Sequence, residues 1–197
     1  MPDTDTDESL LARARAGDEE AFLSIYTRHR VAMYRFACRL LGDASVAEDV
    51  THDCFLSLFK HPERFDAERG ASLRTYLFAA VRNLSLKHFR RAAQETLIDE
   101  AAAEPSAPVA EQPLSRMLEA ELSAAVRAAV ERLPALQREV LILFEFENLS
   151  LQEIAAVVGA EVNTVKSRLA RGRDGLRRAL APQLERRARE VAGVPAK

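Results

Sequence analysis

The sequence predicts an all-α fold, with two small helical domains joined by a flexible linker. Apolar residues return every three or four positions over most of the 197 residues, and no segment alternates as a strand does. Helix-capping residues, glycines and prolines lie between these periodic segments, where helices are expected to begin and end. A stretch rich in Ala, Pro and acidic residues, without Lys or Arg, separates the helices into two groups. These three observations give the fold class.

The first group contains four expected helices, over residues 9–16, 18–41, 45–59 and 72–93. Asp18 is placed to cap the free backbone N–H groups of the second helix. Ser45 and Glu48 have the spacing of a capping box for the third helix. Residues 62–71 have no helical period and contain Pro and Gly, which predicts a loop.

The linker is predicted over residues 92–115, which contain three prolines and five acidic residues and no sustained apolar period. Its position gives a first domain over residues 1–91 and a second over residues 116–197. A linker of this composition allows either a compact or an extended arrangement of the two domains.

The second group begins with helices over residues 118–133 and 135–147. Ser150 and Glu153 form a second capping box, which opens a short helix that ends at Gly159. After a turn, a helix is expected from residue 164 until Pro182. Two short helices around a glycine turn are typical of a helix-turn-helix, so the second domain is predicted to contain one.

The net charge of -2 conceals two basic segments. Residues 69–91 contain six Lys or Arg and no acid, and residues 163–180 contain six against one acid. The outer face of the last helix suits a DNA major groove, because Arg can span both acceptors of a guanine edge. A solvated basic face is the alternative, but the capping box, the glycine turn and the one-sided charge together favour DNA. That face consists of Lys166, Ser167, Ala170, Arg171 and Arg173.

The first basic segment is interleaved with aromatic residues, a mixture that suits single-stranded nucleic acid. Tyr76 could stack on an unpaired base, and the Asn83 amide could read one. Leu77, Phe78 and Phe89 are interpreted instead as the inner, core-facing side of their helix.

Catalysis, metal binding and membrane insertion have little support. None of the four histidines has a partner at a diagnostic spacing, and no phosphate loop or nucleophile motif occurs, so neither enzymatic activity nor a cofactor is expected. Cys38 and Cys54 could form a redox pair or share a metal with His52, but two small buried side chains are the favoured interpretation. The few cysteines and the acidic N-terminus without an apolar segment predict a cytoplasmic protein.

Two segments carry a family resemblance: residues 47–91, AEDVTHDCFLSLFKHPERFDAERGASLRTYLFAAVRNLSLKHFRR, and residues 133–180, LPALQREVLILFEFENLSLQEIAAVVGAEVNTVKSRLARGRDGLRRAL. Together they resemble a bacterial RNA polymerase sigma factor of the extracytoplasmic-function (ECF) group. The resemblance implies that the first domain binds core RNA polymerase and opens the minus-10 promoter element, and that the second binds the minus-35 element. Anti-sigma proteins commonly hold members of the group inactive, which adds a candidate partner.

The resemblance also assigns residues to three surfaces. Contact with core polymerase is implied for Asp49, His52 and Asp53. Contact with the minus-10 element is implied for Phe65, Asp66, Arg69, Arg74, Tyr76, Arg82, Asn83, Arg90 and Arg91. Contact with the minus-35 element is implied for Thr164, Lys166, Ser167, Ala170, Arg171 and Arg173.

The chain departs from the family pattern at three positions. His52 replaces the usual Gln, Tyr76 the usual Trp, and Ala170 a larger side chain. Tyr has less stacking area than Trp, so weaker strand opening is expected. A stand-alone helix-turn-helix regulator is the main alternative, and a helical RNA-binding or structural adaptor is a third. The helical, aromatic and basic first half favours the sigma factor.

Overall fold

The computed structural model describes residues 5–66, 70–96 and 124–191, and these residues contain helices and no strand. A helix also covers residues 124–131. The other elements are α1 (Asp7–Arg15), α2 (Glu19–Leu41), α3 (Ala44–Lys60), the 3-10 turn η1 (Pro62–Arg64), α4 (Leu73–Thr96), α6 (Ala135–Glu145), α7 (Leu151–Val158) and α8 (Val162–Val191).

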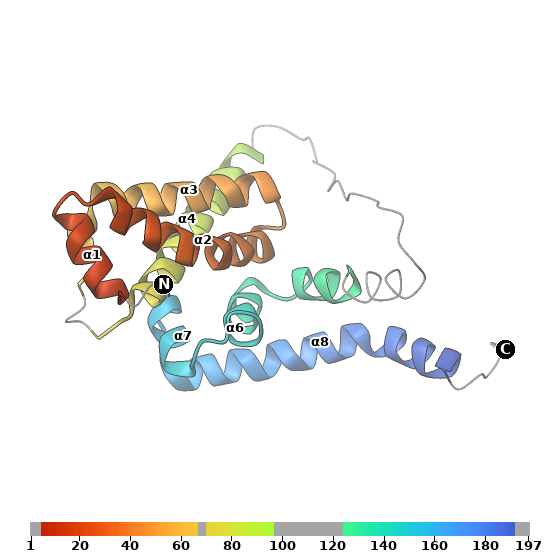
Figure 1. The fold of residues 1–197 in the computed structure, drawn as a ribbon. Helices are drawn as coiled ribbons and strands as arrows, with labels where there is room; N and C mark the ends of the chain where they lie inside the picture. The colour runs from red at the N-terminus through yellow and green to blue at the C-terminus, as the bar shows by residue number, and fades with distance from the viewer. Residues whose placement is uncertain (1–4, 67–69, 97–123, 192–197) are drawn as a thin grey trace.

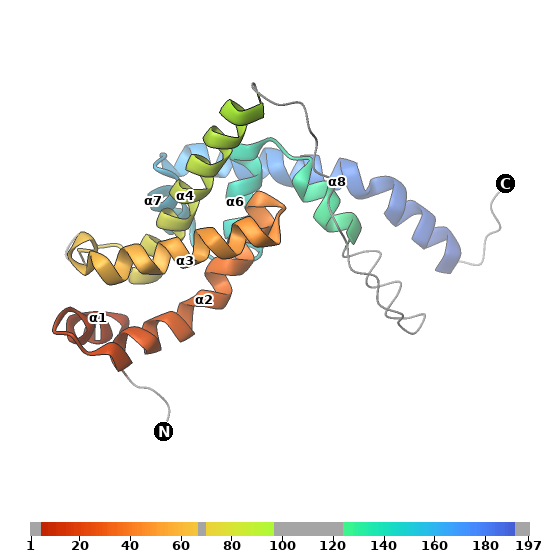
Figure 2. The ribbon, with the colours of Figure 1, turned by 90° about the horizontal axis from the view of Figure 1, so that it is seen from above.

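The helices form two bodies that lie against each other (Figure 1). Helices α1–α4 form the first body, and α6–α8 form the second. The bodies meet where α4 packs on α7 and where α2 packs on α6. Figures 1 and 2 both show the C-terminal part of α8 extending well past α1–α4.

The core of the first body lies between α2, α3 and α4, which contact one another extensively. Phe36 of α2 and Phe78 of α4 are fully buried and pack edge to face, with their ring centroids 5.3 Å apart. Asp18 Oδ1 accepts hydrogen bonds from the backbone N–H groups of Glu20 and Ala21, both at 3.1 Å. The predicted cap of α2 is therefore present.

Two expectations about the first body are corrected. The capping box at Ser45 is wrong, because Asp43 caps α3 by accepting from the backbone N–H groups of Ser45 and Val46 at 2.8 and 3.1 Å. Helix α4 extends to Thr96, so it includes residues 92–96 of the predicted linker. The remainder of that linker lies outside the described residues.

The second body contains the predicted helix-turn-helix in α7 and α8. The Ser150 hydroxyl accepts from the Glu153 N–H at 3.2 Å, while the Glu153 carboxylate accepts from the Ser150 N–H at 2.8 Å. Gly159 ends α7 with a φ of 63°, a left-handed conformation that glycine adopts without strain. Val165 and Leu169 of α8 are buried in the seam between these helices.

The end of α8 differs from the prediction. Pro182 was expected to stop the helix, yet α8 continues to Val191 with Pro182 inside it. Proline removes one backbone hydrogen bond and disfavours the helical conformation of the residue before it. A helix can nevertheless continue past a proline with a local distortion. Within the described ranges, no helix is long and apolar enough to cross a bilayer.

Helix α1 is fixed to α2 by a partly buried ionic cluster that makes stability depend on pH. His29 Nε2 lies 2.8 Å from Asp7 Oδ2, and Arg28 Nη1 donates to Asp7 Oδ1 at 2.6 Å. Burial lowers the pKa of His29 from its ordinary value of about 6.5, and Asp7 opposes this effect only in part. The unfolded chain therefore takes up a proton first as the pH falls, and the free energy of unfolding should decrease below about pH 6.5.

This prediction can be checked by urea unfolding at about pH 7.5 and about pH 5.5. The variant His29→Gln should lose much less stability between the two pH values than the wild type. The exposed His61 supplies a control, since His61→Gln should keep the full pH dependence. An unchanged slope in His29→Gln would contradict the assignment.

Candidate functional site

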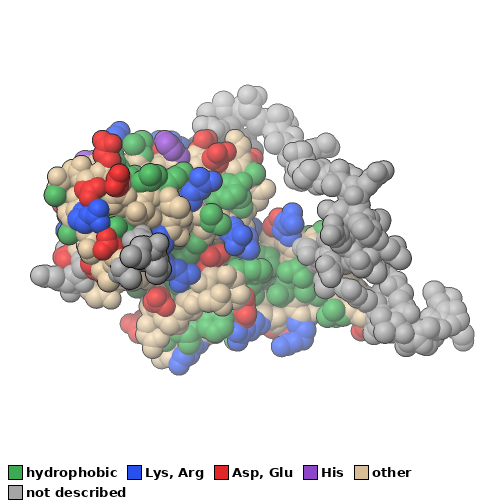
Figure 3. Space-filling view, in the orientation of Figure 1, with side chains coloured by type: hydrophobic (Ala, Val, Ile, Leu, Met, Phe, Trp, Pro, Cys, Tyr) green, Lys and Arg blue, Asp and Glu red, His purple; other side chains and the backbone are tan. Residues whose placement is uncertain are grey.

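The outer face of α8 is open to solvent. Its buried residues, Val165 and Leu169, face the core, so the positions on the other side of the helix point outward. Figure 3 shows Lys and Arg side chains along the lower edge of the molecule, where α8 runs. All six positions assigned to the minus-35 element are exposed: Thr164, Lys166, Ser167, Ala170, Arg171 and Arg173.

Two side chains on this face are held in place by neighbours. Arg173 Nε donates to Glu145 Oε1 at 2.7 Å, and its guanidinium lies 4.9 Å from the centre of the Phe144 ring. The Ser167 hydroxyl donates to the Asn163 carbonyl at 3.0 Å. The face therefore combines two side chains held by neighbours, Arg173 and Ser167, with the exposed side chain of Arg171.

The residues assigned to the minus-10 element are not all on one surface. Asp66, Asn83, Arg90 and Arg91 are exposed, and Tyr76 is half-buried. Phe65 is only 3% exposed and packs edge to face on Tyr76, with 5.5 Å between ring centroids. Its ring thus belongs to the core and holds the start of the loop against α4. Arg69 lies outside the described residues.

The core-facing side of α4 agrees with the sequence interpretation at two of three positions. Leu77 and Phe78 are fully buried, whereas Phe89 is 37% exposed. Phe89 therefore lies at the edge of the body, where its ring packs beside His88 at a centroid distance of 6.5 Å.

Two arginines of α4 point toward the second body. Arg82 makes a two-pronged ion pair with Glu139 of α6, with Nε–Oε2 at 2.7 Å and Nη2–Oε1 at 3.3 Å. Arg74 donates to the backbone carbonyl of Glu147 and lies over the Phe78 ring. Both arginines were expected to hold a DNA backbone, and here they join the two bodies.

The two acidic residues that these arginines contact were not singled out from the sequence. Glu139 and Glu147 are 2% and 6% exposed, among the most buried charged residues that the structure describes. Arg39 of α2 donates to Glu147 Oε1 at 3.0 Å. Burial raises the pKa of Glu147, and the positive charges of Arg39 and Arg74 oppose that effect. The only local signal was that Glu139 directly precedes the apolar run 140–144 and that Glu147 follows it by three residues.

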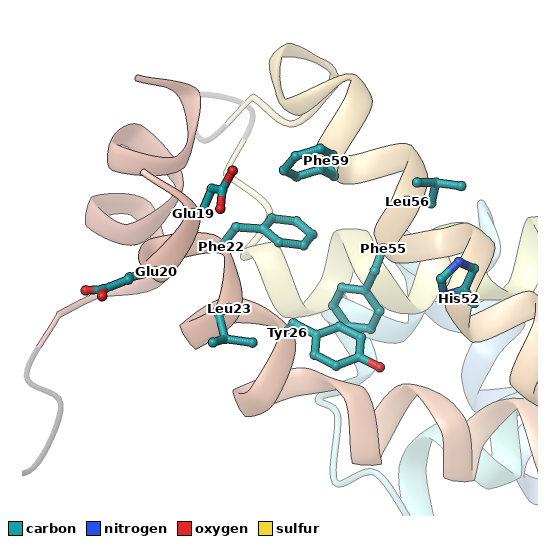
Figure 4. Close-up of a pocket in the computed structure, with 9 residues that line it drawn as sticks. All are labelled: Glu19, Glu20, Phe22, Leu23, Tyr26, His52, Phe55, Leu56 and Phe59. Atoms are coloured by element: carbon teal, nitrogen blue, oxygen red, sulfur yellow. The ribbon is translucent and has the colours of Figure 1, made fainter. Parts of the chain in front are cut away.

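The outer side of α3 carries the three positions assigned to core polymerase. Asp49, His52 and Asp53 are all exposed. Beside them an apolar groove of ≈ 660 Å³ opens between α2 and α3 (Figure 4). Aromatic and aliphatic side chains from both helices face one another across it, and His52 stands at one end. The groove is lined by Glu19, Glu20, Phe22, Leu23, Tyr26, His52, Phe55, Leu56 and Phe59.

The two cysteines are free thiols in different environments. Cys54 is 2% exposed, and burial raises its pKa to about 12, which makes it a poor nucleophile. Cys38 is partly exposed. Among the residues that the structure describes, no cluster of three or more His, Cys, Asp or Glu side chains could hold a metal ion.

Comparison with known proteins gives this arrangement a family. The Sigma-70 region 2 model matches residues 25–95, and the Sigma-70 region 4 model matches residues 123–176. The ECF RNA polymerase sigma factor SigM of Mycobacterium tuberculosis is 32% identical over 177 residues, which cover 89% of this chain and 85% of that protein. The chain belongs to the ECF group of RNA polymerase sigma factors.

Other relatives agree. The ECF sigma factor SigW of Bacillus subtilis is 29% identical over 86% of this sigma factor and 94% of its own length. The solved structure of CnrH, in complex with the cytosolic domain of CnrY, is 27% identical, covers 90% of this chain and 99% of that one, and has a TM-score of 0.67. The sigma factor RpoE from Bartonella quintana, solved with the anti-sigma factor NepR, has the same TM-score at 24% identity, with 81% and 96% covered.

These matches confirm the all-α, two-domain fold prediction and the sigma-factor prediction, and they give no support to a stand-alone regulator. The sigma factor is a non-catalytic specificity subunit that directs RNA polymerase to promoters. Its partners are accordingly core RNA polymerase and promoter DNA.

Proposed function

We propose that this sigma factor divides promoter recognition among three surfaces. The first domain, residues 1–91, uses α3 to bind core polymerase and α4 to capture the minus-10 strand. Helix α4 runs on to Thr96, and the rest of the segment up to residue 115 links it to the second domain, residues 116–197, which uses α8 to bind the minus-35 duplex. The observation that carries this proposal is the exposure of every assigned position on α8, opposite a buried seam.

The α3 surface has the chemistry that a basic polymerase surface with apolar contacts requires. Asp49 and Asp53 supply negative charge, which complements a basic partner and steers its approach. The adjoining groove exposes Leu23 and Phe59 by 59% and 53%. Large apolar side chains exposed side by side are typical of a protein interaction site. Acidic and apolar contacts therefore form one continuous surface, with His52 between them.

The α4 surface suits single-stranded DNA. Tyr76 is a neutral phenol whose ring can stack on a base, and burial raises its pKa further from the physiological range. Asn83 exposes an amide that can pair with a base edge. Arg90 and Arg91 are exposed on the same helix and can neutralise backbone phosphates.

The relatives indicate how this sigma factor is regulated and where it acts. CnrH and RpoE were solved with the cytosolic domain of CnrY and with the anti-sigma factor NepR. An anti-sigma factor is by this likeness a proposed partner of this chain as well. The sigma factor would act in the cytoplasm, where its polymerase is found.

Size-exclusion co-migration with sigma-free core RNA polymerase tests the proposal. The full chain should form a stoichiometric complex that starts transcription from a subset of promoter-containing DNA fragments. A folded chain that binds its cognate core polymerase but selects no promoter would refute the proposed DNA surfaces. Failure to bind core polymerase would refute the α3 surface.

The substitution Asn83→Ala should slow promoter opening by about tenfold while leaving duplex binding nearly unchanged, because a base-reading amide acts only after the strands separate. Permanganate reactivity of unpaired thymines reports opening, and fluorescence anisotropy on the closed duplex reports binding. The exposed Lys87 of the same helix supplies a control, since Lys87→Ala removes a side chain outside the assigned set. Normal opening with Asn83→Ala would remove Asn83 from the minus-10 surface.

A further inference from the structure

We propose that Glu139 and Glu147 form a latch that holds the free sigma factor closed by occupying arginines of its own DNA-binding surface. The inference rests on the proposed function, because it assumes that Arg74 and Arg82 contact the minus-10 strand. At the boundary between the bodies, the Glu139 carboxylate meets Arg82, and the Glu147 carboxylate meets Arg39. The backbone carbonyl of Glu147 accepts from Arg74.

Arg82 carries the clearest evidence. Its two-pronged pair with Glu139 places two carboxylate oxygens where a phosphate would place two of its own. Only 13% of the Arg82 side chain is exposed, against 3% for Glu139. A guanidinium buried in this way cannot reach a DNA backbone. Arg168 of α8 adds a longer contact to the same carboxylate, at 3.8 Å.

The second contact point is built on Glu147. Its carboxylate accepts from Arg39, and its backbone carbonyl accepts from Arg74, so one residue engages both α2 and α4. The Arg39 guanidinium also lies 4.6 Å from the centre of the neighbouring Phe146 ring. Acidic groups of the second body therefore cover positive groups of the first at two separate places.

Ion pairs of this kind suit a reversible contact. Removing both charges from water is expensive, so a buried pair adds little net stability even when its geometry is good. DNA phosphates or polymerase can then compete for the same arginines. The α3 surface and its groove remain exposed in the closed form, so core polymerase can bind before the bodies separate.

The first test measures shape. In the double variant Glu139→Gln and Glu147→Gln, the side chains keep their size and lose their charge, and small-angle scattering should show a larger radius of gyration than in the wild type. The matched control is Glu131→Gln with Glu185→Gln, two exposed acids of the second half. An extended wild type, or a variant as compact as the wild type, would overturn the latch.

The second test measures DNA binding with a fluorescent mixed-sequence single strand. A closed form that is incompetent to bind lowers the apparent affinity by the open fraction, so the latch variant should bind about tenfold more tightly than the wild type. The control variant loses the same two charges and should change the affinity much less. Equal gains in both variants would mean that net charge alone is responsible, which contradicts the latch.

A charge exchange separates the latch from the proposed function. Glu139→Arg and Arg82→Glu should each expand the chain, and the two together should restore its compactness. In the open double-Gln variant, Arg82→Gln should then lower single-strand affinity. If the exchange restores compactness but Arg82→Gln leaves affinity unchanged, the contact stands and the role of Arg82 in DNA binding is refuted. If the exchange fails to restore compactness while helical circular dichroism stays native, the latch is refuted.

Discussion

Reversing Asp49 and Asp53 to Lys is expected to lower the affinity of the sigma factor for core RNA polymerase by about a hundredfold or more, because like charges then face each other across the interface. Both carboxylates are exposed on α3, beside the apolar groove, so the substitutions should leave the fold intact. Affinity can be measured by anisotropy of a labelled sigma factor titrated with sigma-free core polymerase.

The control for this experiment changes the same charge elsewhere. Glu131→Lys with Glu185→Lys alters two exposed acids far from α3 in the sequence and should retain binding within a few-fold. A second arm replaces Phe59, which is 53% exposed in the groove, with Asp. If the α3 reversal binds as tightly as the control, the polymerase surface lies elsewhere on the chain.

Local signals predicted most of the helices correctly. Asp18, Gly159 and the pair Ser150 and Glu153 act within one helical turn, so their effect depends on few neighbours. The errors also lie at helix ends. Asp43 and Ser45 are both good caps, and the sequence did not tell which one the chain would use. Proline in a helix is usually unfavourable, which is why the sequence predicts an end at Pro182, yet α8 continues past it.

The candidate site was predictable where a single helix determines it. The exposed face of α8 follows from helical periodicity, since Val165 and Leu169 identify the buried side. The pairing of Arg82 with Glu139 joins residues 57 apart in the sequence, on different bodies. No periodic pattern encodes such a contact, because it depends on how the two bodies meet. The burial of Phe65 against Tyr76 is a long-range effect of the same kind.

The arginines predicted to contact DNA fall into two classes, those exposed to solvent and those bound to the second body. Arg90, Arg91 and Arg171 are exposed and available in this arrangement. Arg74 and Arg82 are held by the second body. A promoter complex that uses both classes requires the bodies to separate first. Weak DNA binding by the free chain would then follow from its closed arrangement as well as from its small net charge.

Arg171→Ala is expected to lower the affinity for a minus-35 duplex by about tenfold or more, because one bidentate contact to a guanine edge contributes that much discrimination. Arg171 is exposed on α8, and its removal leaves the buried seam at Val165 and Leu169 untouched. Core polymerase binding should be unchanged. The measurement uses reconstituted polymerase and duplexes that the wild-type complex selects from a random library.

Two further variants show whether Arg171 reads bases or only neutralises phosphate. Arg171→Lys keeps the charge but loses the planar fork, so it should bind non-specific duplex normally and still lose sequence preference. Arg178 is also exposed on α8 and pairs with Asp174 at 3.0 Å, so Arg178→Ala is the matched control. If Arg171→Lys retains full sequence preference, Arg171 is a phosphate contact. If Arg171→Ala reduces polymerase and duplex binding equally, α8 does not act as a separate DNA-recognition surface.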